Sequence, residues 1–225
     1  MIGRFFTMIF CVMTVAITPA LAQLQKQKHN FSIGVNGGLN LSSIDISPRI
    51  KQSTFMGPTA GLTARYISEK YFSMICGIQA EVNYSHRGWK ELIEDNSGDS
   101  YQRTMHYVEI PLLAHLAFGK EYGNGARFII NLGPQVGFLL GENEKHAIPS
   151  IEKEEYGKAA ERSFDYGITG GGGVELRTGI GNFIMEGRYY FGLSDFFNST
   201  KKDYFSRSAH TYISAKITYL FDIRK

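Results

Sequence analysis

The chain has 225 residues, a formal net charge of +3, 43% hydrophobic and 13% aromatic residues, and two cysteines. This length suits a single domain, and the small net charge argues against nucleic acid as a partner. After residue 22 the sequence lacks an apolar run of about 18 residues, the minimum for a membrane-spanning helix, so helical spans are excluded there.

Residues 1–22 have the features of a secretory signal peptide. Arg4 supplies the positive charge, residues 5–18 are uncharged and mostly apolar, and Ala20-Leu21-Ala22 fits an A-x-A cleavage site. A transmembrane anchor fits less well, because the apolar run is short and a polar segment follows it directly. We therefore expect a mature domain of residues 23–225, in which Cys76 is the remaining cysteine and no intrachain disulfide forms.

The rest of the sequence repeats a period-two pattern that predicts strands. In residues 103–118 the even positions from Val108 to Phe118 are all apolar, whereas the odd positions include Arg103, Glu109 and His115. A period of two indicates a strand, and a strand with one apolar face of membrane-crossing length is typical of a transmembrane barrel wall. Eight such strands are predicted: Asn30–Leu41, Gly57–Ile67, Phe72–Ser85, Arg103–Phe118, Ala126–Leu140, Phe164–Thr178, Phe183–Leu193 and Ala209–Asp222.

The connections between these strands alternate in length. The long ones are residues 42–56, 86–102, 141–163 and 194–208, and the short ones are residues 68–71, 119–125 and 179–182. Outer-membrane barrels have long extracellular loops and short periplasmic turns. The sequence therefore predicts an all-β fold, an eight-stranded antiparallel up-and-down transmembrane β-barrel in the bacterial outer membrane, with both termini in the periplasm.

Aromatic residues and prolines add two local expectations. Aromatics near strand ends predict interfacial girdles; they are Tyr66, Phe72, Tyr84, Trp89, Phe118, Phe138, Phe183, Tyr219 and Phe221. Pro111 and Pro134 each lack a backbone donor, so they predict bulges or local breaks in the fourth and fifth strands. If these strands are neighbours, the two prolines share one weak seam.

The inward face of the predicted barrel is charged. Its ionisable residues are Arg65, Glu81, Glu109, Arg127, Glu175, Arg177, Glu186, Arg188 and Lys216. An eight-stranded barrel is just wide enough for side chains to fill it, and buried charges must be paired. We therefore expect an ion-pair network that plugs the lumen, in preference to a narrow pore or a bound ligand. Inward glycines leave room for long side chains or for strand curvature; they are Gly34, Gly38, Gly61, Gly77, Gly171 and Gly173.

Catalytic, cofactor and metal motifs are weak. The histidines are scattered, with His106 on the lipid-facing register and His115 and His210 on the lumen face. No metalloprotease, nucleophile-elbow or Cys/His metal spacing is present. The run Gly170–Gly173 has no following Lys-Ser/Thr and no helix pattern, so a strand bend is favoured over a phosphate-binding loop. We expect no catalytic, cofactor or metal site.

Several strands resemble those of PorT-type outer-membrane β-barrel proteins. The segments Tyr107-Val108-Glu109-Ile110-Pro111-Leu112-Leu113 and Gly133–Leu140 are similar to two successive strands of that family, as are Gly170–Glu175 and Arg188–Leu193 to two later ones. The resemblance covers essentially the mature chain and implies an OmpA/OmpX-like barrel with a secretion or export association in one member, but no single activity. The chain departs from the usual aromatic end of such barrels, because Asp222-Ile223-Arg224-Lys225 follows Phe221.

The function expected from these patterns is that of a non-enzymatic outer-membrane protein. Expected partners are outer-membrane lipid, the barrel-assembly machinery, and envelope or secretion proteins that bind loops 42–56, 86–102, 141–163 and 194–208. A small passive pore and an outer-membrane lipid-modifying enzyme remain alternatives. A soluble lipocalin-like binder is disfavoured, because that fold needs an apolar interior and here both signs of charge occupy the inward face.

Overall fold

Long antiparallel strands make up nearly all of the described chain in this computed structural model. It describes residues 30–47, 52–72, 74–91, 101–119, 123–146, 163–194 and 207–224; the predicted signal peptide, residues 1–22, lies outside them. The strands are β1 (Asn30–Ser47), β2 (Gln52–Ser53), β3 (Phe55–Tyr71), β4 (Met74–Glu91), β5 (Tyr101–Gly119), β6 (Gly125–His146), β7 (Phe164–Thr178), β8 (Gly181–Gly192) and β9 (Arg207–Arg224). The described residues hold no helix long and apolar enough to cross a membrane.

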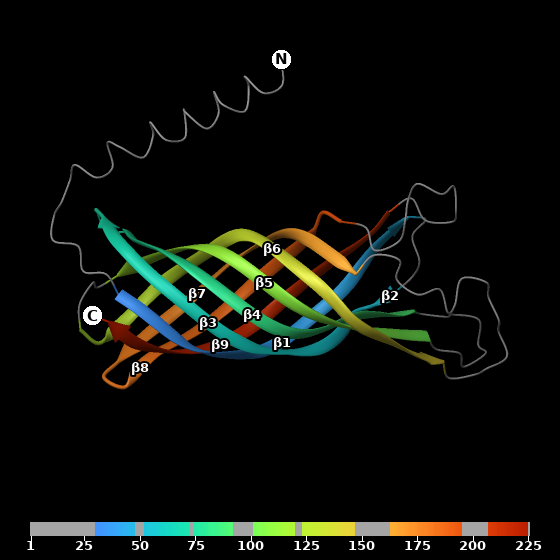
Figure 1. The fold of residues 1–225 in the computed structure, drawn as a ribbon, viewed down its shortest axis with the longest axis horizontal. Coiled ribbons are helices and arrows are strands. Elements are labelled where there is room, and N and C mark those ends of the chain that lie inside the picture. Colours follow the sequence, from blue (N-terminus) through green and yellow to red (C-terminus); the bar gives the residue numbers. More distant parts are fainter. Residues whose placement is uncertain are drawn as a thin grey trace, which may run out of the picture.

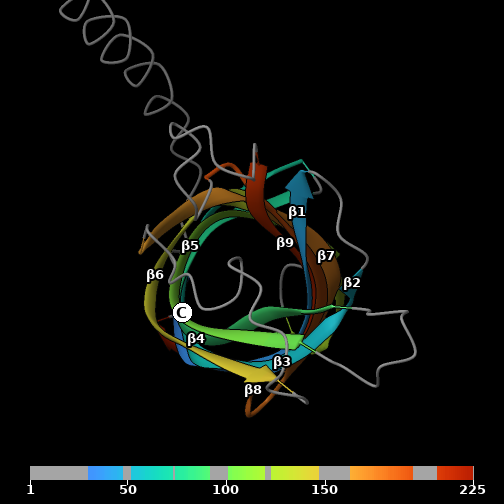
Figure 2. The ribbon, with the colours of Figure 1, turned by 90° about the vertical axis from the view of Figure 1, so that its right-hand side faces the viewer.

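Eight of these strands close into a barrel, which confirms the predicted fold class. Each pairs antiparallel with its neighbours in the order β4-β3-β1-β9-β8-β7-β6-β5, and β4 also pairs with β5 to complete the ring (Figure 2). The remaining strand, β2, adds two residues beside the far end of β4. The C terminus lies at the same end as the β5–β6 and β7–β8 connections (Figure 1).

The strands alternate as the sequence predicts. Along β8 buried and exposed residues follow one another without a break from Asn182 to Gly192. The outward positions form an apolar belt that includes Ile33, Leu62, Ile78 and Leu132, all more than a third exposed. In an antiparallel wall with a charged interior, this belt is the surface that contacts lipid.

The long connections are shorter than predicted, because the strands continue past the apolar belt. Ser42–Ser47 pairs with residues 207–212, and residues 141–146 pair with residues 101–106. The sequence predicted loops here because the extensions are rich in polar residues. Beyond the belt, however, outward polar side chains contact headgroups and water, and inward charged side chains form ion pairs, so polar residues are compatible with strands there. Residues 42–47, 86–91, 101–102, 141–146 and 207–208 are therefore strand. The predicted turn at residues 68–71 also belongs to a strand, β3, and Phe72, predicted to begin a strand, lies in a turn with φ of 53°.

The aromatic girdle prediction is wrong at one residue. Trp89 is 6% exposed and lies on the lumen side, whereas Phe72 is exposed in its turn and the outer wall carries Tyr66, Tyr84, Phe118, Phe138, Phe183 and Phe221. The guanidinium of Arg103 lies 5.5 Å from the Trp89 ring centroid. The Trp89 side chain therefore packs on an inward-facing guanidinium. It was predicted at the membrane interface because it lies near the end of a strand.

The prolines interrupt pairing without forming bulges. Between β5 and β6 the pairing stops after Pro111–Gln135 and resumes at Ala114–Leu132 in the same register. Pro134 lies within that gap, so the two prolines share one break, as the sequence predicts for neighbouring strands. The β4–β5 ladder has a matching gap between Ala80–Leu112 and Asn83–Glu109. The register shift between β5 and β6 lies elsewhere, between His106 and Tyr107, where β6 has one extra residue, Leu140.

Candidate functional site

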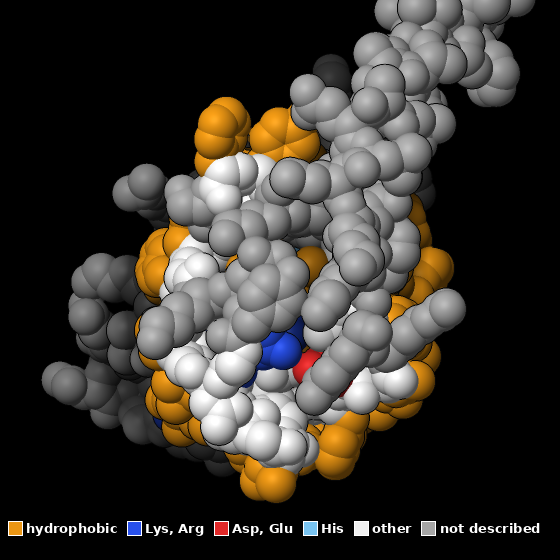
Figure 3. All heavy atoms as spheres, turned by 90° about the vertical axis from the view of Figure 1, so that its left-hand side faces the viewer, with side chains coloured by type: hydrophobic (Ala, Val, Ile, Leu, Met, Phe, Trp, Pro, Cys, Tyr) orange, Lys and Arg blue, Asp and Glu red, His pale blue; other side chains and the backbone are white. Residues whose placement is uncertain are grey.

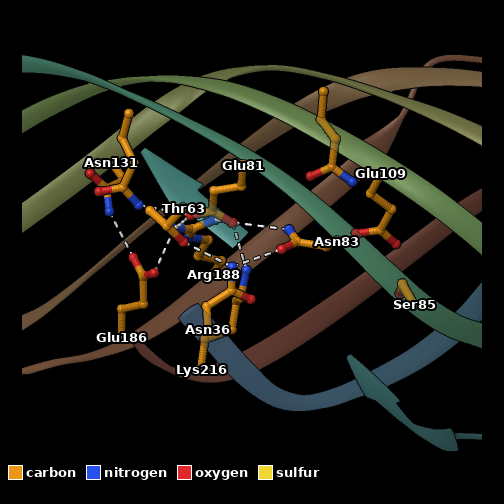
Figure 4. A network of polar contacts seen from close by, with 12 residues as sticks. Asn36, Thr63, Glu81, Asn83, Ser85, Glu109, Asn131, Glu186, Arg188 and Lys216 are labelled. Atoms are coloured by element: carbon orange, nitrogen blue, oxygen red, sulfur yellow. Dashed lines mark hydrogen bonds and ion pairs between the residues drawn. The ribbon is translucent and has the colours of Figure 1, made fainter. Parts of the chain in front are cut away.

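The central layer of the lumen is an ion-pair cluster around Glu81, on β4. Arg188 on β8 donates to both Glu81 oxygens, with distances of 2.6 and 3.0 Å, and Lys216 on β9 donates to Oε2 at 2.6 Å. Arg188 also donates to Glu186 at 2.5 Å. These side chains converge from the barrel walls (Figure 4). All four are at most 5% exposed, so each charge is compensated where water is largely excluded.

Neutral side chains complete the hydrogen bonding of this cluster. Gln79 and Asn83 each donate to Glu81, at 2.7 and 3.0 Å. Asn131 donates to Glu186 at 2.7 Å, and Asn36 on β1 reaches past β3 to donate to Asn83 on β4 at 2.8 Å. The cluster is thus a network across several strands, an arrangement that holds the lumen side chains in fixed positions.

A second layer lies toward the end of the barrel where β1 begins and β9 ends (Figure 1). Arg65 donates to Glu175 at 2.7 Å, Arg127 lies 3.8 Å from the same carboxylate, and His115 lies 3.5 Å from Arg65. At the mouth Arg177 is half-buried and pairs with Asp222 at 3.5 Å. Cationic and acidic side chains are visible in this mouth (Figure 3).

An apolar cluster accompanies the second layer and was missed from the sequence. It contains Ile67, Ile75, Ala117, Ile129, Ile184 and Leu220, none more than 9% exposed. These residues occupy inward positions, so the parity of the strands is the signal that identifies them; their apolar side chains resemble those of the lipid-facing positions. Together the apolar and charged side chains fill this part of the lumen.

The third layer, toward the opposite end, surrounds Arg87. Its guanidinium lies 4.6, 4.8 and 4.7 Å from the ring centroids of Tyr107, Tyr190 and Tyr212. Its carboxylate partners are Glu109 at 2.7 Å and Asp165 at 2.5 Å. A guanidinium over aromatic faces and between two carboxylates satisfies both its charge and its planar shape.

The lumen ends in a fourth group around Arg103. Arg103 is 1% exposed and pairs with Glu142 at 2.7 Å and Glu144 at 3.3 Å, both on the extension of β6. Arg87, Arg103, Asp165 and Glu142 were absent from the predicted lumen set. Continuing the alternation of β4 past Ser85 would have placed Arg87 inward, and Asp165 shares the parity of Glu175.

The nine residues predicted for the lumen divide among three of these layers and the mouth. The structure brings Glu81, Glu186, Arg188 and Lys216 together in the centre, Arg65, Arg127 and Glu175 together in the second layer, and places Glu109 beside Arg87. Arg177 belongs to the mouth. Among the described residues no group of three or more His, Cys, Asp or Glu side chains could hold a metal ion.

A closed antiparallel barrel with an apolar outer belt and a charged, side-chain-filled interior defines an outer-membrane β-barrel protein. The sequence matches the family of the outer membrane protein beta-barrel domain over residues 21–198, and the chain belongs to that family. The protein is therefore located in the bacterial outer membrane.

Comparisons with solved structures found distant similarity to two outer-membrane proteins. Ail, the attachment invasion locus protein of Yersinia pestis, is 11% identical over 84% of this chain and 98% of its own, with a TM-score of 0.36. Neisserial surface protein A is 12% identical over 85% of this chain and 97% of its own, with a TM-score of 0.40. No curated protein sequence matches the chain.

Proposed function

We propose that this protein is a non-enzymatic, PorT-type component of the outer membrane that acts through its extracellular loops. The observation that carries the proposal is the filling of the lumen by paired charges and an apolar cluster. With the interior occupied and the wall in contact with lipid, the segments between strands at the end opposite the termini are the surface available to soluble partners.

The orientation of the barrel in the membrane supports a role for these extracellular loops. The described strands are joined by short connections at the end with the C terminus, and the long intervals, such as residues 147–162 and 195–206, belong to the other end. Long loops are extracellular in outer-membrane barrels. Envelope or secretion proteins are the proposed partners there, and the barrel-assembly machinery is the proposed partner during insertion.

The test is loop exchange combined with crosslinking in intact outer membranes. Residues 48–51, 92–100, 147–162 and 195–206 are replaced one at a time by Gly-Ser linkers of equal length, with replacement of the turn residues 179–180 as the control. We expect a crosslinked partner that disappears with one loop and persists in the turn variant. A partner unaffected by all four loop exchanges would contradict the proposal.

The second candidate is a small passive pore, favoured by the polar character of the lumen. It is tested separately by planar-bilayer recordings, because loop exchange leaves the lumen unchanged. Discrete conductance by the unaltered protein would favour the pore over the loop-mediated role.

A further inference from the structure

Polar side chains gather on the outer wall of β4, β5 and β6 just above the apolar belt. We call this surface the outer collar and define it as Tyr84, His86, Lys90, His106, Asn143 and Lys145. It faces sideways from the barrel, at the end opposite the termini. Its residues lie on strands and face away from the lumen.

Strand register arranges the outer collar in rows. His86 pairs directly with His106, which pairs with Gly141. One step of the alternation further out is the row of Gly88, Thr104 and Asn143, and a second step further out Lys90, Gln102 and Lys145 stand opposite one another. The row below, Tyr84, Val108 and Phe138, is the last of the belt. Because a lipid-facing band is about 25 Å tall and ends at the interface, the histidine and lysine rows lie at the level of the headgroups.

Side-chain contacts hold the centre of the outer collar in place. The His86 and His106 rings meet edge to face with centroids 4.4 Å apart. The Tyr84 hydroxyl lies 3.0 Å from Nδ1 of His106, and Asn143 Nδ2 lies 3.2 Å from its Nε2. Beside His106, a Cβ atom added at Gly141 would meet nothing within 4 Å, so there is open space next to this group of donors.

The charge of the outer collar is positive. Lys90 and Lys145 are exposed on it, whereas the acidic residues of the same β6 extension, Glu142 and Glu144, point inward to Arg103. Imidazole, ammonium, amide and phenol groups all donate hydrogen bonds to phosphate oxygens. An anion is therefore the complementary ligand.

We propose that the outer collar binds the phosphate-bearing headgroup of a glycolipid in the outer leaflet. The sideways direction of the surface and its height beside the apolar belt favour a lipid embedded next to the barrel over an anion that arrives from solution. The acyl chains of such a lipid would lie along the belt below, where Ile110 and Phe138 are exposed.

The experiment uses the mature protein in phosphatidylcholine nanodiscs that contain lipid A, dephosphorylated lipid A or phosphatidylglycerol, with native mass spectrometry to measure retained lipid. Lipid A is expected to be retained most strongly. Equal retention of dephosphorylated lipid A, or a preference for phosphatidylglycerol, would overturn the proposal. Competition by millimolar inorganic phosphate as effective as lipid A itself would also overturn it, because the site would then recognise the free anion.

Variants locate the site on the barrel. A basic side chain near an anionic lipid surface contributes about five-fold in affinity, so Lys90→Gln with Lys145→Gln should weaken lipid A retention by about 25-fold. His86→Asn with His106→Asn should weaken it several-fold. Thr211→Val is the control, because β9 lies across the ring from β5. Heat-modifiable electrophoretic mobility verifies folding, and folded variants that all retain lipid A equally would refute the assignment.

Discussion

Single carboxylates each balance several buried cations in this lumen. Glu81 accepts hydrogen bonds from Arg188, Lys216 and two neutral side chains. Loss of the Glu81 charge would leave Arg188 and Lys216, each at most 5% exposed, with less negative charge to balance them. Inward parity alone predicts that Glu81, Arg188 and Lys216 face the lumen. Their mutual pairing was unpredictable, because it depends on the register and shear of strands more than a hundred residues apart.

The central cluster makes a residue-scale prediction. Glu81→Gln should lower the free energy of unfolding by about 3–5 kcal/mol, the usual cost of breaking a buried pair from one side. Urea titrations in lipid vesicles measure it. Arg177→Gln, at the half-buried mouth pair, should cost under about 1 kcal/mol and serves as the control. Equal losses for the two variants would contradict the role given to Glu81.

At the scale of the strand, glycine determines how closely neighbouring backbones approach. A Cβ atom at Gly171 on β7 would collide with the carbonyl oxygen of Gly187 on β8, whereas at Gly187 itself it would meet nothing within 4 Å. The sequence predicted either space for side chains or curvature at the inward glycines. The structure shows close backbone contact at Gly171, a detail that only the paired strand can reveal.

These two positions form a matched pair of substitutions. Gly171→Ala should destabilise the barrel by about 1–3 kcal/mol because the methyl group has to displace backbone. Gly187→Ala, on the adjacent strand, should change the free energy of unfolding by less than about 0.5 kcal/mol. Urea titration of both variants in the same vesicles provides the measurement, and a tolerated Gly171→Ala would show that the strands separate more easily than the structure implies.

The proline seam makes a second prediction at this scale. The backbone of Leu112 faces β6 within the gap between the β5–β6 pairs, so its amide should exchange hydrogen faster than the amide of Ala114, which faces β6 where the pairing has resumed. The β8–β9 ladder, continuous from Asn182 to Phe191, is the internal control. Amide hydrogen exchange is measured by NMR in nanodiscs. Protection across the seam equal to that of the β8–β9 ladder would contradict this prediction.

At the scale of the whole molecule, the lumen is a stack of charged layers with an apolar cluster near one mouth. The fold class and the number of barrel strands were predictable, because every strand repeats the alternation of apolar and polar residues and the connections alternate between long and short. The ends of the strands were not, since extensions such as residues 141–146 carry polar residues on both faces. Arg87, which lies in the extension of β4 past Ser85, was missed for the same reason.

A filled lumen predicts that the barrel does not conduct ions. The mature protein inserted in planar bilayers should show no steady unitary conductance at moderate voltage, because the central layer and the apolar cluster obstruct the path. Current recordings provide the measurement, with protein-free insertion buffer as the baseline. A reproducible single-channel step from the unaltered protein would mean that ions pass the Glu81 cluster.

The most direct test of the filled barrel is a spin-label scan of β5 in lipid vesicles. In a Cys76→Ser background, single cysteines from Tyr107 to Ala117 carry the label, and collision rates with oxygen and with a water-soluble nickel complex are measured. Even positions such as Leu112 should collide with oxygen, and odd positions such as Leu113, 1% exposed, with neither reagent. Odd positions that collide freely with the nickel complex would show a water-filled lumen and contradict the account.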